Sequence, residues 1–192
     1  MAKVSVIGAA GYSHHYPKLA TIVTAHAKGK DNAMAVAWHS SISVNPPLYG
    51  VSIAPGRFTY ELIVEAGEFG VNFIAMDKAE LVAAVGGSSG RAVDKFEKFG
   101  LAKETPLKTS VPILRDAYAA YECRLFGHTA YGDHVWVVGE ILATHYDDEL
   151  FPEKQGLDMG RFSPALYLGA EKYTTVANDI LRQLDRKVYG KG

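Results

Sequence analysis

The chain has 192 residues, of which 48% are hydrophobic, and this is enough for one domain with a packed core. Its 20 Lys and Arg residues nearly balance its 21 Asp and Glu residues, so the basic surplus that non-specific nucleic-acid binding requires is missing. The single cysteine, Cys123, excludes an intrachain disulfide framework and a cysteine metal site, and we expect it to be an inert core thiol.

The N-terminal segment at 4–11 reads VSVIGAAG, which suggests a strand followed by a glycine turn. A dinucleotide-binding fingerprint needs glycines at its first, third and sixth positions. Counted from Gly8, the later two positions hold Ala10 and Ser13, and Pro17 interrupts the helix that should follow. We therefore interpret the segment as a flexible N-terminal arm. It lacks a complete signal-peptide pattern, and the chain has no run of about 18 apolar residues, so we expect a cytoplasmic protein.

The first third of the chain predicts strands joined by turns. β-branched residues indicate a strand at 19–24, turn-forming residues occupy 28–32, and a second extended segment covers 33–43. Two prolines then interrupt the pattern, and a third strand is expected at 48–54. These elements indicate an antiparallel hairpin followed by a further strand.

The middle of the chain alternates short helices with one strand. The spacing of apolar residues predicts a helix at 59–66, with Thr59 as the expected N-cap and Gly67 as the residue that ends the helix. A strand is expected at 69–74, and further short helices at 78–85 and 92–99.

The clearest hairpin of the sequence spans 118–146 and bends at 131–134. Residues 151–170 are rich in Gly and Pro and predict an irregular segment, and 174–189 predict an amphipathic C-terminal helix. Hairpin strands with only short helices between them favour a mainly β fold, an antiparallel barrel with peripheral helices, over a doubly wound sheet. We expect a single domain over 1–192.

One stretch of the sequence, 31–63, carries the functional information: DNAMAVAWHSSISVNPPLYGVSIAPGRFTYELI. The sequence here resembles the flavin reductase-like FMN-binding split-barrel family in the order of three motifs, NAMAVAW, SVNPP and SIAPGRFTYELI. Two later motifs, SGRAVDKF at 89–96 and GDH at 132–134, support the resemblance. This family includes flavoredoxins and the reductase components of two-component monooxygenases. The resemblance spans about 16–146, and it implies an antiparallel split β-barrel, bound FMN, and a homodimer with the flavin near the subunit boundary.

The resemblance implies that Asn32, Ala33, Met34 and Ala35 line the isoalloxazine ring of the flavin. Their small side chains and backbone amides allow the main chain to approach the edge of the ring. The resemblance also favours a flavin contact for Trp38. Two alternatives stay open, because Asn32 is a common turn residue and a strand Trp is often part of the core.

Ser52, Arg57 and Thr59 are the candidate ligands for the phosphate of FMN. Arg57 presents a planar fork of donors that suits phosphate oxygens, and the helix expected to begin at Thr59 favours an anion at its N-terminus. The simpler alternative for Arg57 is a surface charge after a Pro-Gly turn.

Four further residues, from later parts of the chain, complete the candidate site. Ser89 and Gly90 are candidates for hydrogen bonds to phosphate or ribityl oxygens, whereas the neighbouring Ser88 is better explained as a loop residue. Lys95 would place a positive charge near the flavin, where it stabilises the anionic reduced ring; the alternative is a solvated helix lysine. By resemblance, His134 at the hairpin bend reaches the flavin or the nicotinamide, and it is the candidate catalytic residue.

The resemblance implies hydride transfer from NADH or NADPH to the flavin, with electrons passed to free flavin or to a protein acceptor. The irregular segment from Phe151 to Tyr167 is expected to cover the reacting face, with Phe162 and Tyr167 as candidates. Two other functions stay open: a flavoredoxin-type carrier or ferric reductase with the same FMN, and a non-catalytic β-barrel binding module. We expect no metal site, because the histidines lack a spacing of the HExxH kind, and no nucleic-acid or membrane partner.

Overall fold

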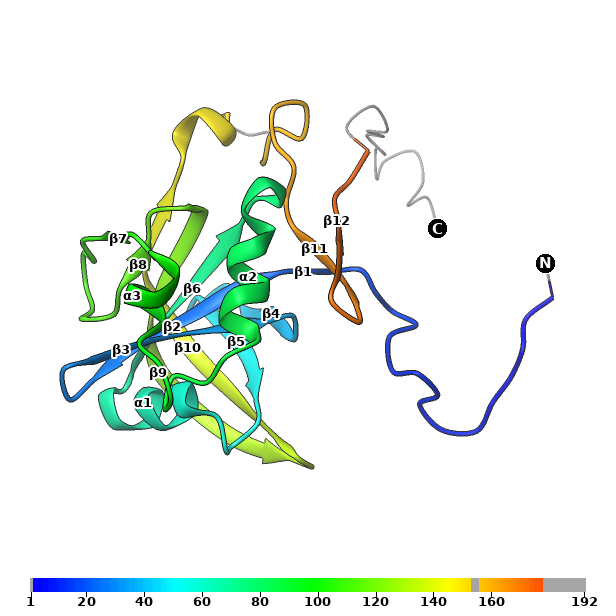
Figure 1. Ribbon diagram of the computed structural model, residues 1–192, viewed down its shortest axis with the longest axis horizontal. Coiled ribbons are helices and arrows are strands. Elements are labelled where there is room, and N and C mark those ends of the chain that lie inside the picture. Colours follow the sequence, from blue (N-terminus) through cyan, green and yellow to red (C-terminus); the bar gives the residue numbers. More distant parts are fainter. Residues whose placement is uncertain (1, 153–155, 178–192) are drawn as a thin grey trace.

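The computed structural model describes residues 2–152 and 156–177 (Figure 1). Its main sheet is antiparallel and has seven strands in the order β3-β2-β6-β9-β10-β5-β4. These strands are β2 (Thr21–Ala27), β3 (Lys30–Val36), β4 (His39–Ser43), β5 (Leu48–Ile53), β6 (Glu68–Ile74), β9 (Ala117–Tyr131) and β10 (His134–Tyr146). The mainly β fold that the sequence predicts is confirmed.

Shorter elements surround this sheet. The helices are α1 (Phe58–Ala66), α2 (Ala79–Gly86) and α3 (Lys95–Phe99), and Figure 1 shows them around the barrel rather than inside it. Two small sheets contain β1 (Lys18–Leu19), β11 (Leu166–Gly169) and β12 (Lys172–Thr174), and β7 (Lys103–Glu104) and β8 (Ile113–Leu114). In the described part of the chain, the helices are too short or too polar to cross a membrane.

The barrel is split between its two edge strands, β3 and β4. They follow each other along the chain with only Ala37 and Trp38 between them, yet they lie at opposite edges of the sheet. The backbone N–H of Ser52 donates to the carbonyl of Trp38 at 2.8 Å and holds this link against the end of β5. The edge of β3 that faces the split therefore has backbone groups available to a ligand.

The two faces of β2 explain how the core is organised. Val23 belongs to the apolar cluster inside the barrel with Phe69, whereas Ile22 belongs to a second cluster, which also contains Val85 of α2 and Phe96 of α3. Successive side chains of a strand point to opposite faces, so β2 supplies both clusters and is apolar along most of its length.

The first hairpin has a shorter turn than the sequence predicts. Lys28 and Gly29 have positive φ values of 51° and 71°, and this two-residue turn joins β2 directly to β3. The prediction of a turn at 28–32 is therefore wrong, and Asn32 is a strand residue. The extended segment predicted at 33–43 is divided at Ala37 and Trp38, so Trp38 lies between strands.

Helix α1 begins one residue earlier than predicted, and the N-cap assigned to Thr59 is wrong. The cap is Arg57, whose backbone is extended (φ −76°, ψ 135°), and no described side chain caps the helix there. Thr59 instead lies in the first turn with its side chain buried. Gly67 ends the helix in the left-handed conformation, as predicted.

The remaining predictions of elements have mixed outcomes. The long hairpin is confirmed as β9 and β10, and α2 lies close to its predicted place, but α3 begins only at Lys95 because Asp94 caps it by accepting from the Phe96 and Glu97 N–H groups. The segment predicted to be irregular contains β11. The helix predicted at 174–189 is wrong at its start, since Thr174 ends β12; its part from 178 onward lies outside the described residues.

Cys123 lies in β9 and is buried, as expected for an inert core thiol. Burial and, to a smaller extent, the neighbouring charge of Glu122 raise the pKa of the thiol to about 12. The reactive thiolate form is therefore scarce at neutral pH.

Candidate functional site

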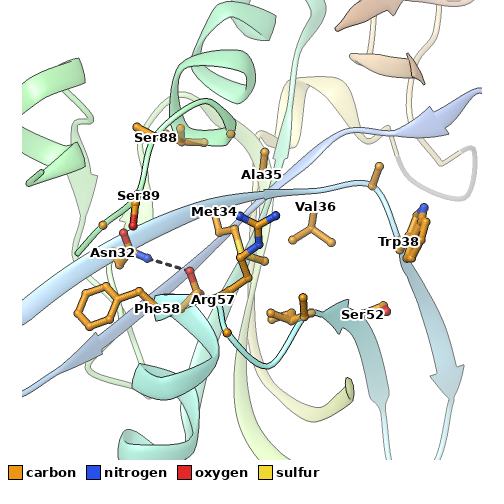
Figure 2. Close-up of a pocket in the computed structure, with 18 of the residues that line it drawn as sticks. Asn32, Met34, Ala35, Val36, Trp38, Ser52, Arg57, Phe58, Ser88 and Ser89 are labelled. Atoms are coloured by element: carbon orange, nitrogen blue, oxygen red, sulfur yellow. Dashed lines mark hydrogen bonds between the residues drawn. The ribbon is translucent and has the colours of Figure 1, made fainter. Parts of the chain in front are cut away.

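A pocket of about 320 Å³ opens at the split of the barrel (Figure 2). β3 and the link to β4 form one side, and the start of α1 and the loop after α2 contribute the others. The structure brings most of the predicted site residues to this pocket: Asn32, Met34, Ala35, Trp38, Ser52, Arg57, Thr59, Ser89, Gly90, Lys95 and His134.

Ala33 is the exception among the predicted site residues. Its side chain is fully buried in the cluster formed with α2 and α3. Only its carbonyl takes part in the surroundings of the pocket, as an acceptor for Lys95.

Asn32 forms a buried polar contact with Thr59. Its Nδ2 donates to Thr59 Oγ1 at 2.8 Å, and the two residues are 2% and 1% exposed (Figure 2). Among the described residues, Asn32 Oδ1 has no hydrogen-bond partner. Gly90 packs against this oxygen so closely that a Cβ atom at Gly90 would lie 2.0 Å from it. The pocket therefore contains an unpaired acceptor that a loop glycine leaves in place.

Lys95 is buried, and the alternative of a solvated helix lysine is wrong. Its Nζ donates to the carbonyls of Ala33 and Val85 at 2.8 and 2.7 Å, which ties the start of α3 to β3 and α2. Burial and, to a smaller extent, the positive charge of Arg57 lower the pKa of Lys95 to about 8. A bound anion near the two cations would favour the charged form of Lys95.

The lowered pKa predicts how binding of a phosphate-bearing ligand depends on pH. The charge of Lys95 is lost as pH rises through about 8, so FMN affinity should fall several-fold between pH 7 and pH 9. Riboflavin, which lacks the phosphate, serves as the matched control ligand and should show a flatter profile in the same fluorescence titration. In Lys95→Met the affinities for FMN and for riboflavin should depend on pH in the same way. If they already do so in the wild-type protein, the prediction is contradicted.

One end of the pocket suits an anion. Arg57 is exposed at the N-terminus of α1, whose first residues also line the pocket. It forms no ion pair within the described chain. The N-terminus of a helix favours a negative charge. Ser88 and Ser89 line the same pocket, so Ser88 belongs to it as well, whereas Ser52 lies toward the opposite end beside Trp38 (Figure 2). Ser88 is partly engaged, since its Oγ donates to the Ala84 carbonyl at 3.2 Å.

The other end of the pocket is aromatic. Trp38 Nε1 donates to the Tyr16 hydroxyl at 2.9 Å, and the rings of Trp38 and His134 lie 4.9 Å apart. His134 Nδ1 is 2.8 Å from Asp133 Oδ1, which fixes the orientation of the imidazole. Tyr16 at this end, and Phe58 beside Asn32 at the opposite end, are pocket residues that the sequence analysis did not single out.

The two candidates for a cover over the site lie in different places. Tyr167 lines the pocket. Phe162 does not line it; its ring packs 4.4 Å from that of Tyr118 and borders a separate cavity. The prediction for Phe162 is therefore wrong, because the segment before β11 packs on the far end of the long hairpin.

The fold and the pocket agree with what comparison with known proteins shows. The flavin reductase like domain matches residues 13–177 of the chain. The chain belongs to the flavin reductase-like family. This confirms the family that the motifs at 31–63 and 89–96 indicate.

Several known proteins are similar to this flavin reductase-like protein in sequence or in fold. The FMN-binding protein from Thermus thermophilus, solved with bound 1-cyclohex-2-enone, has a TM-score of 0.82 and 32% identity, over 95% of this chain and 98% of that chain. Flavoredoxin from Methanosarcina acetivorans has a TM-score of 0.82 and 29% identity, over 98% and 100% of the two chains. The FMN reductase (NADH) SmoA of Agrobacterium fabrum is 31% identical over 74% of this chain and 78% of its own length.

Proposed function

We propose that this flavin reductase-like protein binds FMN in the pocket at the split of the barrel and uses it to oxidise NADH or NADPH. One observation carries the proposal: a single pocket joins an anion-binding end to an aromatic end along the open edge of β3. FMN has the matching shape, with a phosphate at one end and a flat ring at the other. The names of the similar proteins support the same cofactor.

The residues of the pocket fit FMN in kind as well as in place. Arg57 and Ser89 would hold the phosphate together with the start of α1, whereas Ser52, the other serine candidate from the sequence, lies beside Trp38 at the aromatic end. The backbone at Met34 and Ala35 would border the ring. The unpaired buried oxygen of Asn32 marks a place where a ligand group is expected to donate a hydrogen bond.

When bound, FMN supplies the chemistry of accepting a hydride from a reduced nicotinamide and passing the electrons on. The chain's part is to bind, orient and shield. Tyr16 holds the indole of Trp38 in place by accepting its N–H, so the phenol proton of Tyr16 stays free to donate to a ligand. His134, oriented by Asp133, borders the same end and would contact the nicotinamide or the flavin.

A groove of about 690 Å³ continues from the aromatic end of the pocket, with which it shares Trp38, Ser52 and His134. Lys18, Tyr131 and Trp136 also line it. A cation and aromatic faces suit a dinucleotide, which carries a pyrophosphate and two planar bases. We infer that the reduced nicotinamide dinucleotide enters through this groove.

Titration of the purified protein with FMN, followed by anaerobic stopped-flow reduction with NADH and with NADPH, tests this function. We expect a flavin spectrum that bleaches rapidly with one of the two donors. A protein that binds no FMN would overturn the proposal and favour the non-catalytic binding module. Steady-state oxidation with free FMN or with a ferric chelate then identifies the acceptor. Reduction without turnover on either would indicate a flavoredoxin-type carrier for a protein acceptor.

We also infer that the chain forms a homodimer, as the resemblance to its family implies. Large apolar side chains are exposed on the β4–β5 hairpin at Ile42 and Val44 and on β9 at Phe126, and these would be covered by a second copy. Light scattering on the eluted protein measures the oligomeric state directly, and a monomer at micromolar concentration would contradict the inference.

Arg57→Ala should weaken FMN binding by about 30- to 100-fold while leaving riboflavin binding within about twofold, because only FMN carries the phosphate that the guanidinium would bind. Arg91→Ala is a matched control: Arg91 is also exposed, but its guanidinium pairs with Glu61 at 2.6 Å and lies outside the pocket lining. Fluorescence titration of both variants with both flavins measures the effect. Equal losses for FMN and riboflavin would remove Arg57 from the phosphate site.

A further inference from the structure

The buried oxygen of Asn32 constrains which part of a ligand lies beside it. Asn32 is 2% exposed, lines the pocket, and has its amide held by the bond from Nδ2 to Thr59. With that bond made, Oδ1 faces the loop at Gly90, which also lines the pocket, and no described residue donates to it. A group that meets this oxygen must therefore carry a hydrogen-bond donor.

Thr59 supplies the complementary half of the contact. Its Oγ1 accepts the bond from Asn32, which leaves the hydroxyl proton of Thr59 to be donated. Thr59 also lines the pocket. An acceptor on Asn32 and a donor on Thr59 lie side by side, and an alcohol, which both donates and accepts, matches this pair. A phosphate oxygen or a ring carbonyl of FMN accepts only and does not match it.

The position of Asn32 along β3 decides between the donors that FMN offers, which are its ribityl hydroxyls and the N3–H of its ring. Figure 2 shows Asn32 beside Ser89 and Phe58, with Met34, Ala35 and Val36 between it and Trp38 at the opposite end. Six residues of extended chain span roughly 20 Å. A ring that packs near Trp38 leaves Asn32 opposite the chain that joins ring and phosphate.

We propose that Asn32 and Thr59 recognise one ribityl hydroxyl of the flavin, with Asn32 Oδ1 as acceptor and Thr59 Oγ1 as donor. This rests on the FMN binding proposed above and assigns to Asn32 a role different from lining the ring. Gly90 is part of the device. A Cβ at that position would lie 2.0 Å from Oδ1 and 2.6 Å from Cγ of Asn32, so glycine there keeps the side chain in the orientation that accepts the hydroxyl.

The experiment compares three flavins on the apoprotein by fluorescence titration: FMN, riboflavin and lumiflavin, which retains the ring but carries a methyl group in place of the ribityl chain. Asn32→Leu has a similar shape and accepts no hydrogen bond. We expect this substitution to weaken the binding of FMN and of riboflavin by a similar factor, about 10- to 100-fold, and to leave the affinity for lumiflavin within about twofold of wild type. Arg57→Ala, which should weaken FMN alone, is the contrasting variant.

A second measurement keeps the proposal testable if Asn32→Leu folds poorly. The wild-type protein is titrated with the 2′-, 3′- and 4′-deoxy forms of FMN, and one of them should bind at least tenfold more weakly than FMN. An equal loss of lumiflavin in Asn32→Leu would assign Asn32 to the ring edge and overturn the proposal. So would deoxy forms that all bind like FMN. If the wild-type protein binds no FMN at all, it is the proposed function that fails.

Discussion

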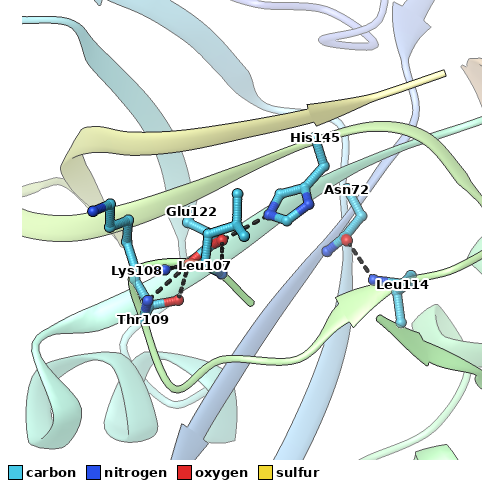
Figure 3. Close-up of polar contacts among 7 residues, drawn as sticks. All are labelled: Asn72, Leu107, Lys108, Thr109, Leu114, Glu122 and His145. Atoms are coloured by element: carbon cyan, nitrogen blue, oxygen red, sulfur yellow. Dashed lines mark hydrogen bonds and ion pairs between the residues drawn. The ribbon is translucent and has the colours of Figure 1, made fainter. Parts of the chain in front are cut away.

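Glu122→Gln should lower the free energy of unfolding by about 3 kcal/mol, the largest stability effect that we expect from one isosteric change. The Glu122 carboxylate is fully buried and anchors the loop before β8 (Figure 3). Its Oε1 accepts from the N–H of Leu107 and lies 2.6 Å from His145 Nε2, and its Oε2 accepts from Lys108 and Thr109. A glutamine amide has N–H groups on one side, so either orientation turns a donor toward backbone donors.

The pH dependence of stability gives a second readout of the same group. Burial alone would raise the pKa of Glu122, but the hydrogen bonds from Leu107, His145, Lys108 and Thr109 outweigh it and lower the pKa to about 2. The contribution of this carboxylate is therefore complete above its ordinary pKa of 4.5 and is lost as pH falls toward 2. Urea unfolding at pH 7 and pH 3 should show a smaller difference between wild type and Glu122→Gln at the lower pH.

Glu68→Gln is the matched control for this prediction. Glu68 accepts from the N–H and hydroxyl of Ser110 in the same loop, both at 2.9 Å, but it is only half-buried. We expect Glu68→Gln to lower the free energy of unfolding by less than about 1 kcal/mol, because solvent can replace the hydrogen bonds of Glu68. Equal midpoints and slopes for the two variants would mean that the loop is held by other contacts.

The local part of the candidate site could be predicted from the sequence because its residues are close in the chain. Asn32, Trp38, Arg57 and Thr59 fall within one stretch that folds as three strands and a helix start, so their motif carries their spatial arrangement. The prediction erred where backbone detail matters. The hairpin turn is two residues long, and this moves Asn32 from a turn into a strand and buries its side chain.

The environment of Lys95 and Glu122 could not be predicted in the same way. Lys95 donates to a carbonyl 62 residues earlier, and no local pattern distinguishes such a lysine from a solvated one. Glu122 is a single charged residue in a long strand, and only the tertiary fold shows that backbone N–H groups converge on it. Tyr16 precedes the motifs altogether, so its contact with Trp38 has no local signal.

Gly90→Ala should weaken FMN binding by about 100-fold or more while the protein still folds. The φ of Gly90 is not left-handed, so alanine can adopt the backbone, but its Cβ would lie 2.0 Å from Asn32 Oδ1. Asn32 must then leave Thr59 and swing toward the pocket, where it occupies space that the ligand needs. The lost hydrogen bond should cost about 1–2 kcal/mol of stability, so the effect on binding should greatly exceed the effect on folding.

Gly87→Ala in the same loop is the control for that substitution. A Cβ at Gly87 would meet its nearest atom, the Ala83 carbonyl oxygen, at 3.4 Å, and Gly87 is not part of the pocket lining. We expect FMN affinity within about threefold of wild type for Gly87→Ala, because the added methyl group meets only ordinary contacts. If Gly90→Ala bound FMN as well as this control, Asn32 would have to move without entering the ligand's space, and the glycine would not be needed for the site.

Combining Gly90→Ala with Asn32→Ala tests whether the displaced Asn32 side chain is what blocks the ligand. Removal of the clashing amide should restore space for the flavin without restoring the hydrogen bond. The double variant should then bind FMN more tightly than Gly90→Ala alone, which is the non-additivity expected of two residues in direct contact.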